Sequence, residues 1–183
     1  MTRETEYQRR IALLDGSGLV RLWEQIEAGT APKSDWEPGR ALEFVVLRAF
    51  QLENAEVRWP YRVELAGEVV EEIDGTVYSD SLCCLVECKD QEKVDFRPVA
   101  KMRNQLLRRP AGTIGAVFSR GGFSEPAIIL AQFTAPQCII LWGGVEIGHA
   151  LRNQCMRRAL LAKYRHWVEH ARPWYNIVQE GFG

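Results

Sequence analysis

A short apolar strand that ends in alternating charges is the most constraining feature of this sequence. Leu82–Val86 is apolar, and Glu87-Cys88-Lys89 follows without a break. Because a strand without polar alternation is buried on both faces, Leu82–Lys89 is predicted at the centre of a sheet. Successive side chains of a strand point to opposite faces, so Glu87 and Lys89 share one face and Cys88 points to the other. The pattern predicts a carboxylate and an ammonium side by side at a strand end, where pockets form in α/β sheets.

The segment before this strand reads as a β-hairpin that carries a second carboxylate. Its two strands are expected at Val57–Leu65 and Val69–Tyr78, with the turn at Ala66-Gly67-Glu68. Asp74-Gly75 lies near the end of the second strand. The glycine permits a bulge or the close approach of a neighbouring backbone, although Asp-Gly pairs are also common in ordinary turns.

Strand alternation predicts the direction of the Asp74 side chain. Val69, Ile73 and Val77 are expected to point one way, towards the core. Asp74 and Thr76 are expected to point the other way, together with Val70 and Glu72. Two carboxylates and a lysine at neighbouring strand ends suit metal-assisted phosphodiester hydrolysis, because hard divalent cations bind carboxylate oxygens. A solvated cross-strand pair of Glu87 and Lys89 is the alternative, and the apolar strand before them argues against an edge position.

Glu43 is a third candidate carboxylate. It lies in a predicted helix, Arg40–Glu53, that is apolar nearly all round and is therefore expected to be buried. A lone buried carboxylate is costly unless it is paired or bound to a metal. An ion pair with Arg40 or Arg48 and a metal contact, direct or through water, are equally compatible with the sequence.

The rest of the chain alternates helices and strands. Further helices are expected at Thr5–Leu14, Ser17–Ala28, Val99–Arg109, Glu125 to about Phe133 with Ser124 as N-cap, and over most of the segment from Gly144 to about His170; further strands are expected at Thr113–Phe118 and Cys138–Trp142. This order predicts an α/β fold with a mixed β-sheet flanked by helices on both faces.

The net charge of −1 hides an uneven distribution. Residues 97–124 and 147–168 carry basic residues and no acid, whereas residues 35–95 are strongly acidic. An acidic pocket flanked by basic stretches suits a metal-dependent enzyme that acts on a polyanion, although solvated helix faces explain any single arginine as well. The candidates for contact with a nucleic-acid backbone are Lys101, Gln105, Arg108, Arg109 and Arg120.

Composition points to a reducing compartment and away from zinc. The five cysteines form no C-x-x-C pair, so reduced core thiols are expected. No apolar run approaches twenty residues and no signal-peptide pattern opens the chain, which favours a cytoplasmic protein without a membrane segment.

These residues resemble the PD-(D/E)XK, or restriction-endonuclease-like, nuclease superfamily. The matching elements are the buried helix with Glu43, Asp74 on a hairpin strand, and Glu87-Cys88-Lys89 on the next strand. Within the superfamily the chain is most similar to Mrr-type restriction endonuclease catalytic domains. The segments that carry this second similarity are Gly39–Phe44, Gly115–Ser124 and Ile139–Gly144. Two positions depart from the pattern: Ile73 replaces the common proline, and Mrr-type enzymes often have glutamine where Glu87 stands.

The resemblance implies Mg²⁺-dependent cleavage of phosphodiester bonds, with Mn²⁺ as a substitute. Asp74 and Glu87 correspond to the metal ligands, and the Cys88 backbone carbonyl to a third. Lys89 corresponds to the residue that positions or activates the attacking water, and Glu43 to an accessory acid. The nuclease core is expected at residues 39–151, between an N-terminal helical extension (1–38) and a basic C-terminal helical extension (152–183).

DNA is the expected partner, and restriction or anti-phage defence the expected setting. A chain of 183 residues is small for a nuclease that both recognises and cuts, so a homodimer or a larger defence or repair complex is expected. Two alternatives remain at this point. One is a catalytically silent nuclease-like subunit that binds DNA or a partner protein, and the other is an enzyme that cleaves RNA.

Overall fold

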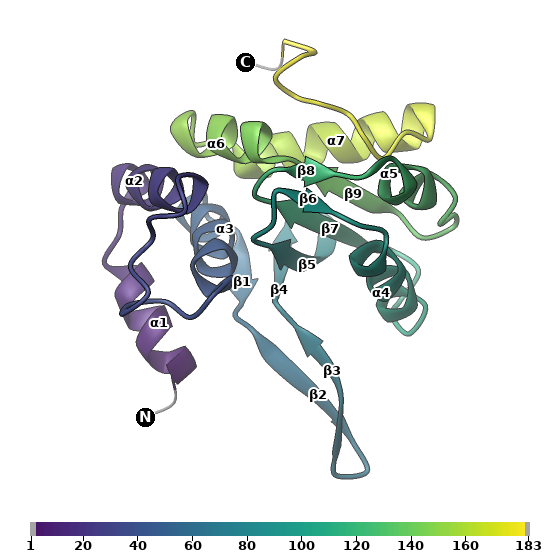
Figure 1. Cartoon of the computed structure of the whole chain (residues 1–183). Coiled ribbons are helices and arrows are strands. Elements are labelled where there is room, and N and C mark those ends of the chain that lie inside the picture. Colours follow the sequence, from purple (N-terminus) through teal and green to yellow (C-terminus); the bar gives the residue numbers. More distant parts are fainter. Residues whose placement is uncertain (1–2, 182–183) are drawn as a thin grey trace.

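A five-stranded mixed sheet forms the centre of the computed structural model, which describes residues 3–181 (Figure 1). Its strands are β1 (Glu56–Arg58), β4 (Gly75–Ser79), β5 (Leu82–Lys89), β7 (Thr113–Ser119) and β9 (Ile139–Trp142), side by side in that order. β4 runs antiparallel to both β1 and β5, whereas β5, β7 and β9 are parallel.

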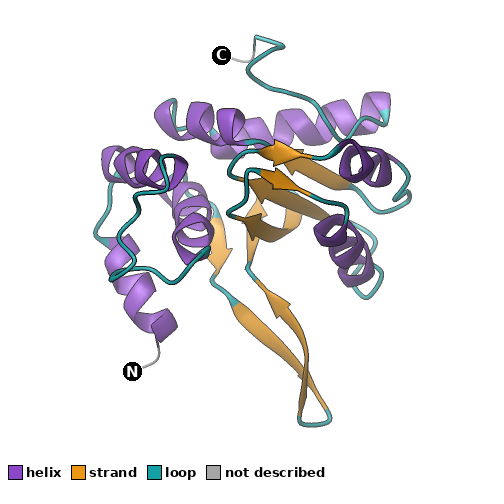
Figure 2. Cartoon of the chain, viewed as in Figure 1, coloured by secondary structure: helices purple, strands orange, loops and turns teal. Residues whose placement is uncertain are grey.

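Helices cover both faces of the sheet (Figure 2). The helices are α1 (Arg3–Ala12), α2 (Gly16–Glu27), α3 (Arg40–Leu52), α4 (Arg97–Leu106), α5 (Glu125–Gln132), α6 (Gly144–Arg152) and α7 (Met156–His170). One buried cluster joins α3 and the terminal helices to one face, and a second cluster joins α4 and α5 to the other. The expected α/β fold, a mixed sheet flanked by helices on both faces, is confirmed.

β5 is the central strand of the sheet, as its apolar sequence predicts. Cys84, Val86 and Cys88 pack in the cluster on the α3 face, whereas Leu85 packs in the cluster on the α4 face. This alternation places Glu87 and Lys89 on the α4 face, opposite Cys88. The prediction that Glu87 and Lys89 share one face is therefore confirmed.

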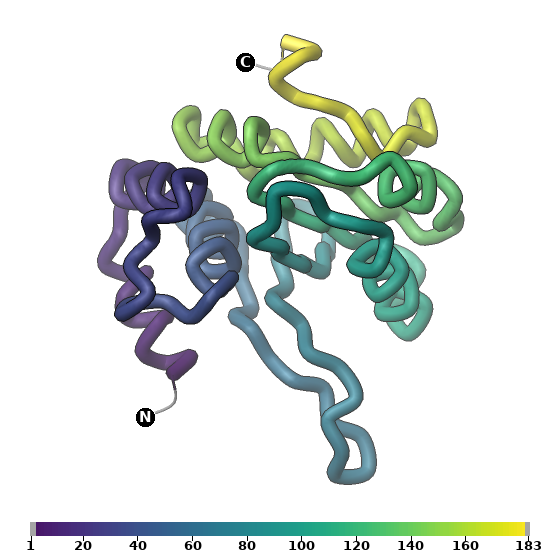
Figure 3. Tube along the Cα trace, viewed as in Figure 1, coloured from purple at the N-terminus to yellow at the C-terminus, as the bar shows by residue number. Residues whose placement is uncertain are grey.

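The expected hairpin is present, but only its first and last strands, β1 and β4, belong to the main sheet. β2 (Tyr61–Leu65) and β3 (Glu68–Ile73) form a separate antiparallel ribbon that turns at Ala66-Gly67 and extends away from the body of the molecule (Figure 3). The expected continuous strand Val69–Tyr78 is wrong, because the chain bends at Asp74 between β3 and β4. A second short ribbon pairs β6 (Lys93–Val94) with β8 (Gly122–Phe123) in parallel.

The bend at Asp74 also overturns the expected side-chain directions. Ile73 packs in the cluster on the α4 face and Val77 in the cluster on the α3 face, so they do not point the same way. Val69 is 47% exposed on the projecting ribbon rather than packed in the core. Alternation along a strand holds only while the strand is continuous, and here it restarts after residue 74.

The cysteine assignment agrees with the structure. All five cysteines are free thiols, and four of them are buried. Among residues 3–181, no helix is both long enough and apolar enough to cross a membrane.

Gly75 allows β4 to pack closely against α3. A Cβ atom at this position would lie 2.5 Å from Cδ2 of Leu47, which is fully buried. The close neighbour is thus a helix side chain rather than a backbone. This contact sets the position of the residue next to it, Asp74.

We expect Gly75→Ala to lower the free energy of unfolding by about 1–3 kcal/mol, the usual cost of overpacking a core. Gly122→Ala is the matched control, because a Cβ atom there meets nothing within 4 Å. Denaturant unfolding of both variants measures the difference. Combining Gly75→Ala with Leu47→Val should recover part of the loss; equal stability of the two single variants would contradict this account.

Candidate active site

The candidate site lies where β4 and β5 separate. Their pairing ends at Gly75 and Val86, so the edge of β5 beyond Val86 has no partner on the β4 side. Asp74 fills this gap, because its Oδ2 accepts a hydrogen bond from the Cys88 backbone N–H at 2.7 Å. The N–H and C=O of one residue in a strand point to the same edge, so the Cys88 carbonyl also faces the gap. The structure thus brings Asp74 to the Glu87-Cys88-Lys89 segment.

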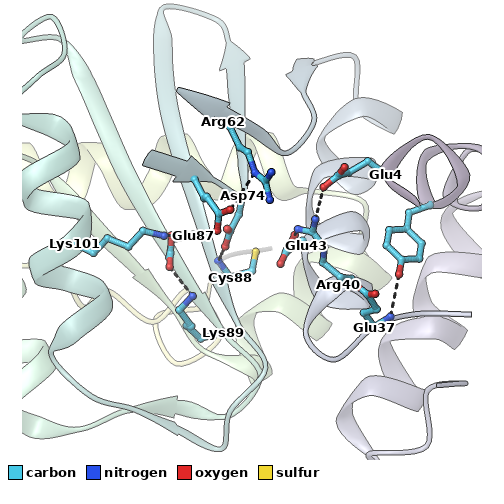
Figure 4. Close-up of polar contacts among 12 residues, drawn as sticks. Glu4, Glu37, Arg40, Glu43, Arg62, Asp74, Glu87, Cys88, Lys89 and Lys101 are labelled. Atoms are coloured by element: carbon cyan, nitrogen blue, oxygen red, sulfur yellow. Dashed lines mark hydrogen bonds and ion pairs between the residues drawn. The ribbon is translucent and has the colours of Figure 1, made fainter. Parts of the chain in front are cut away.

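Glu87 is almost fully buried and contacts two lysines (Figure 4). Lys89 Nζ lies 2.6 Å from Glu87 Oε1, and Lys101 Nζ, from α4, donates to Oε2 at 2.6 Å. Despite the proximity of Lys89, Oε1 is buried without a hydrogen bond of good geometry. Each oxygen of this carboxylate is therefore paired with one lysine ammonium.

Glu43 approaches from the α3 side and is paired with Arg40 at 2.5 Å. Arg40 also binds Glu4 of α1 at 2.6 Å, which joins the N-terminal helix to the site. Arg48 is directed elsewhere, to the side chain of Gln51 and to two carbonyls at the end of α1. Of the two ion pairs considered from sequence, the one with Arg40 is present. Glu4 was not anticipated, since nothing in its local sequence distinguishes it.

Two of the carboxyl groups have raised pKa values. Burial, reinforced by the neighbouring Glu87 carboxylate, raises the pKa of Asp74 to about 6. Burial and the nearby Asp74 carboxylate raise the pKa of Glu43 to about 8, although Arg40 opposes the change. The hydrogen bond from Cys88 and the charge of Lys89 only partly offset the effect at Asp74. Burial is thus the main reason that both carboxyl groups hold their protons more tightly than usual, and shifts of this kind are common at functional sites.

Lys89 and Cys88 have clear protonation states. Burial tends to lower the pKa of Lys89, but the Glu87 and Asp74 carboxylates outweigh it and raise the pKa above its usual value. Complete burial raises the pKa of the Cys88 thiol well above its usual value. In this arrangement Lys89 is an ammonium and a proton donor, and Cys88 is a neutral thiol that serves the site through its backbone.

Two separate cavities border the site, one beside Asp74 and Glu43 and the other beside Glu87 and Lys89. The first, about 690 Å³, lies between the N-terminal region and the hairpin and ends at Glu43 and Asp74. Its charged lining is mostly acidic, with Arg40 and Arg62 as the basic exceptions. The second, about 420 Å³, lies beside α4 and exposes Lys89, Lys101 and Arg97 together with Glu87 and Asp95. The second cavity thus has three basic and two acidic groups, with Lys89 and Lys101 paired to Glu87 and Arg97 paired to Asp95.

Most of the residues expected to contact a nucleic-acid backbone have partners within the chain. Buried Gln105 donates to the Glu72 carbonyl at 3.3 Å. Arg108 and Arg109 both pair with the buried carboxylate of Glu71, on the hairpin. Arg120 pairs with Asp90 at 2.7 Å. Only Lys101 reaches the site, so contact of the others with nucleic acid stays a prediction.

The donor set fits a hard divalent cation. Asp74, Oε1 of Glu87 and the Cys88 carbonyl are oxygen donors around one gap, and oxygen is the ligand that Mg²⁺ prefers. Oε1 of Glu87 already has the Lys89 ammonium 2.6 Å away, so a metal ion at this oxygen would share it with a lysine. Residues 3–181 contain no ready-made cluster of three or more His, Cys, Asp or Glu side chains for a metal. A site here would thus depend on the backbone carbonyl and on water for its remaining ligands.

Comparison with known proteins leaves the family open. The sequence matches no protein-family model and no curated protein. Among solved structures, it is similar to the protein of unknown function AF1548, with a TM-score of 0.47 and 18% identity over 72% of this chain and 67% of that one. It is also similar to MspJI restriction endonuclease, solved with a 27-mer oligonucleotide, with a TM-score of 0.44 and 19% identity over 81% of this chain. The match covers 36% of the MspJI chain. These values are too low for either structure to assign a family or a function.

The raised pKa of Asp74 makes stability depend on pH. As pH rises from about 4 through 6, the unfolded chain releases this proton before the folded protein does, so folding becomes less favourable. We expect Asp74→Asn to remove this cost and to stabilise the metal-free protein at pH 8 by about 1–2 kcal/mol, or roughly 2–8 °C in Tm. The gain should be much smaller at pH 4. Thermal unfolding in EDTA at the two pH values measures it.

Asp95→Asn is the control for this experiment. Hydrogen bonds from the Arg97 side chain and backbone lower the pKa of Asp95, so its contribution to stability is complete above pH 4. The substitution should cause a small loss of stability at pH 8 that becomes smaller at pH 4, the opposite of the gain expected for Asp74→Asn. A Tm for Asp74→Asn that stays at or below the wild-type value at pH 8 would show that the buried carboxylate is not destabilising.

Proposed function

We propose that this protein is a Mg²⁺-dependent nuclease of the PD-(D/E)XK type that hydrolyses phosphodiester bonds in DNA. The observation that carries the proposal is the convergence of Asp74, Glu87 and Lys89 where β4 and β5 separate. Asp74 comes from the bend between β3 and β4, Glu87 and Lys89 come from β5, and Glu43 adds an acid from α3. A purely structural ion pair has no need of a second and a third buried carboxylate beside it.

Asp74, Glu87 and the Cys88 carbonyl would hold the metal, with Glu43 in contact directly or through water. When bound, Mg²⁺ polarises the scissile phosphate and lowers the pKa of a water molecule. The raised pKa values of Asp74 and Glu43 support this assignment, because a cation would favour the ionised forms of both groups.

Lys89 would act as a positioned ammonium. Its raised pKa keeps it protonated at neutral pH, so it would donate hydrogen bonds to the attacking water or to a non-bridging phosphate oxygen. In either position its charge offsets the negative charge that develops in the transition state. Its contact with Glu87 and its place at the end of β5 hold this charge next to the metal ligands.

The substrate would enter from the α4 side. A polyanion is repelled by the acidic walls of the first cavity and attracted by Lys89, Arg97 and Lys101 in the second. Such contacts position a phosphate backbone without reading sequence. Sequence recognition would therefore depend on a second copy of the chain or on a larger complex, in keeping with the resemblance to restriction endonucleases and a role in restriction or anti-phage defence.

Purified protein should convert supercoiled plasmid to nicked or linear DNA in the presence of Mg²⁺ or Mn²⁺ and not in EDTA. Lys89→Ala should lower the rate by about 10²-fold or more, the usual effect of losing one group that stabilises transition-state charge. Lys93→Ala, which removes an exposed lysine from the neighbouring β6, is the matched control and should keep full activity.

Parallel reactions with linear DNA and RNA separate the alternatives. Cleavage of RNA alone would move the substrate class from DNA to RNA. DNA binding without cleavage under any metal would indicate a silent scaffold. Undiminished Mg²⁺-dependent cleavage by Lys89→Ala would exclude the assigned role of this lysine.

A further inference from the structure

Glu87 has two lysine partners, and the second belongs to a different element of the fold. Lys89 follows Glu87 on β5 and contacts Oε1, whereas Lys101 reaches across from α4 and donates to Oε2. Both Nζ atoms lie 2.6 Å from the carboxylate, which is 1% exposed. Two ammonium groups therefore surround a single carboxylate in the metal-free protein.

The two lysines differ in their freedom to move. Lys89 is 31% exposed and interacts with the charges of Asp74 and Glu43 as well as Glu87. Lys101 is 41% exposed, and its side chain borders the second cavity of about 420 Å³. Lys89 borders the same cavity, but Lys101 is the more exposed of the two lysines, and it interacts with Glu87 and Asp74 and not with Glu43.

A divalent cation at Oε1 of Glu87 would place three cationic groups around one carboxylate. Like charges within a few ångströms repel strongly in a partly buried site. The repulsion is relieved when the more exposed lysine, which has fewer acidic neighbours, moves away. Here that group is Lys101.

We propose that Lys101 is an exchangeable counter-ion, which neutralises Glu87 in the metal-free protein and is released into the second cavity when a metal binds. There it binds a phosphate of the substrate, next to Arg97, which is paired with Asp95. This inference rests on the proposed metal site and adds an order of events to it. Metal binding frees a phosphate-binding group, so metal and substrate each strengthen the binding of the other.

The exchange also accounts for the charge of the site before the metal arrives. Without Lys101, the second cavity would expose the Glu87 carboxylate with only one cation beside it. With Lys101 in place, the carboxylate is neutralised while the cavity has one fewer free positive charge for phosphate. Unproductive binding of DNA in the absence of metal is thereby weakened.

Calorimetric titration of the full chain with Mn²⁺, without nucleic acid, tests the first half of the proposal. Lys101→Met should bind Mn²⁺ roughly tenfold more tightly than wild type, because one fewer positive charge opposes the metal. Lys101→Arg keeps the charge and should stay close to wild type. Arg103→Met, two residues further along α4 and exposed, is the charge-matched control and should leave the affinity unchanged.

Acetylation of wild-type protein, read residue by residue by mass spectrometry, tests the release directly. Reaction at Lys101 should rise severalfold when Mn²⁺ saturates the site, whereas reaction at exposed Lys93 should not change. A Lys101 that is equally reactive with and without Mn²⁺ would overturn the exchange, as would unchanged or weaker Mn²⁺ binding by Lys101→Met.

Binding of a fluorescent DNA duplex in EDTA and in Ca²⁺ tests the second half. Wild type should gain affinity with the metal, and Lys101→Met should lose most of this gain and show a salt slope smaller by about one. An equal gain for both proteins would overturn phosphate binding by Lys101. Failure of wild type and every variant to bind Mn²⁺ would instead contradict the metal site of the proposed function, which separates the two failures.

Discussion

The separation of β4 from β5 is the constraint on which the candidate site depends. Their ladder ends at Gly75 and Val86, and the chain before Gly75 leaves the sheet to form the projecting ribbon. This departure exposes a backbone edge in the middle of the molecule. A buried backbone N–H requires a partner, and Asp74 provides it through the hydrogen bond to Cys88. The departure of the chain from the sheet before Gly75 thus places the Asp74 carboxylate beside the end of β5.

Charge is the second organising constraint, and it is nearly balanced within the site. Glu43 is paired with Arg40, and Glu87 with Lys89 and Lys101. Asp74 lies between them and accepts a backbone hydrogen bond. Burial nevertheless raises the pKa values of Asp74 and Glu43. Keeping these two groups ionised at neutral pH therefore lowers the free energy of unfolding. Such a cost is expected where groups are arranged for chemistry rather than for packing.

Strong local patterns explain what could be predicted. Leu82–Lys89 forms a strand with those bounds because its apolar run suits only a doubly covered position. The helix at Arg40 and the capped helix after Ser124 follow from periodicity and capping. The directions of Ile73 and Val77 were predicted wrongly, because alternation was extended through a bend that has no proline or glycine before it. Local sequence does not predict the partners of Arg108 and Arg109, since Glu71 of β3 meets the residues after α4 only in the folded chain.

The sequence by itself determined the central strand, the shared face of Glu87 and Lys89, and the fold class, because these depend on residues close together in the chain. Tertiary structure alone decided that Lys101 of α4 contacts Glu87, that Glu4 of α1 contacts Arg40, and that Asp74 occupies a bend instead of a strand. Each of these contacts joins separate elements, whose relative positions follow from the packing of the whole core. The spacing of neighbouring residues does not depend on that packing, so it does not predict which distant charges come into contact.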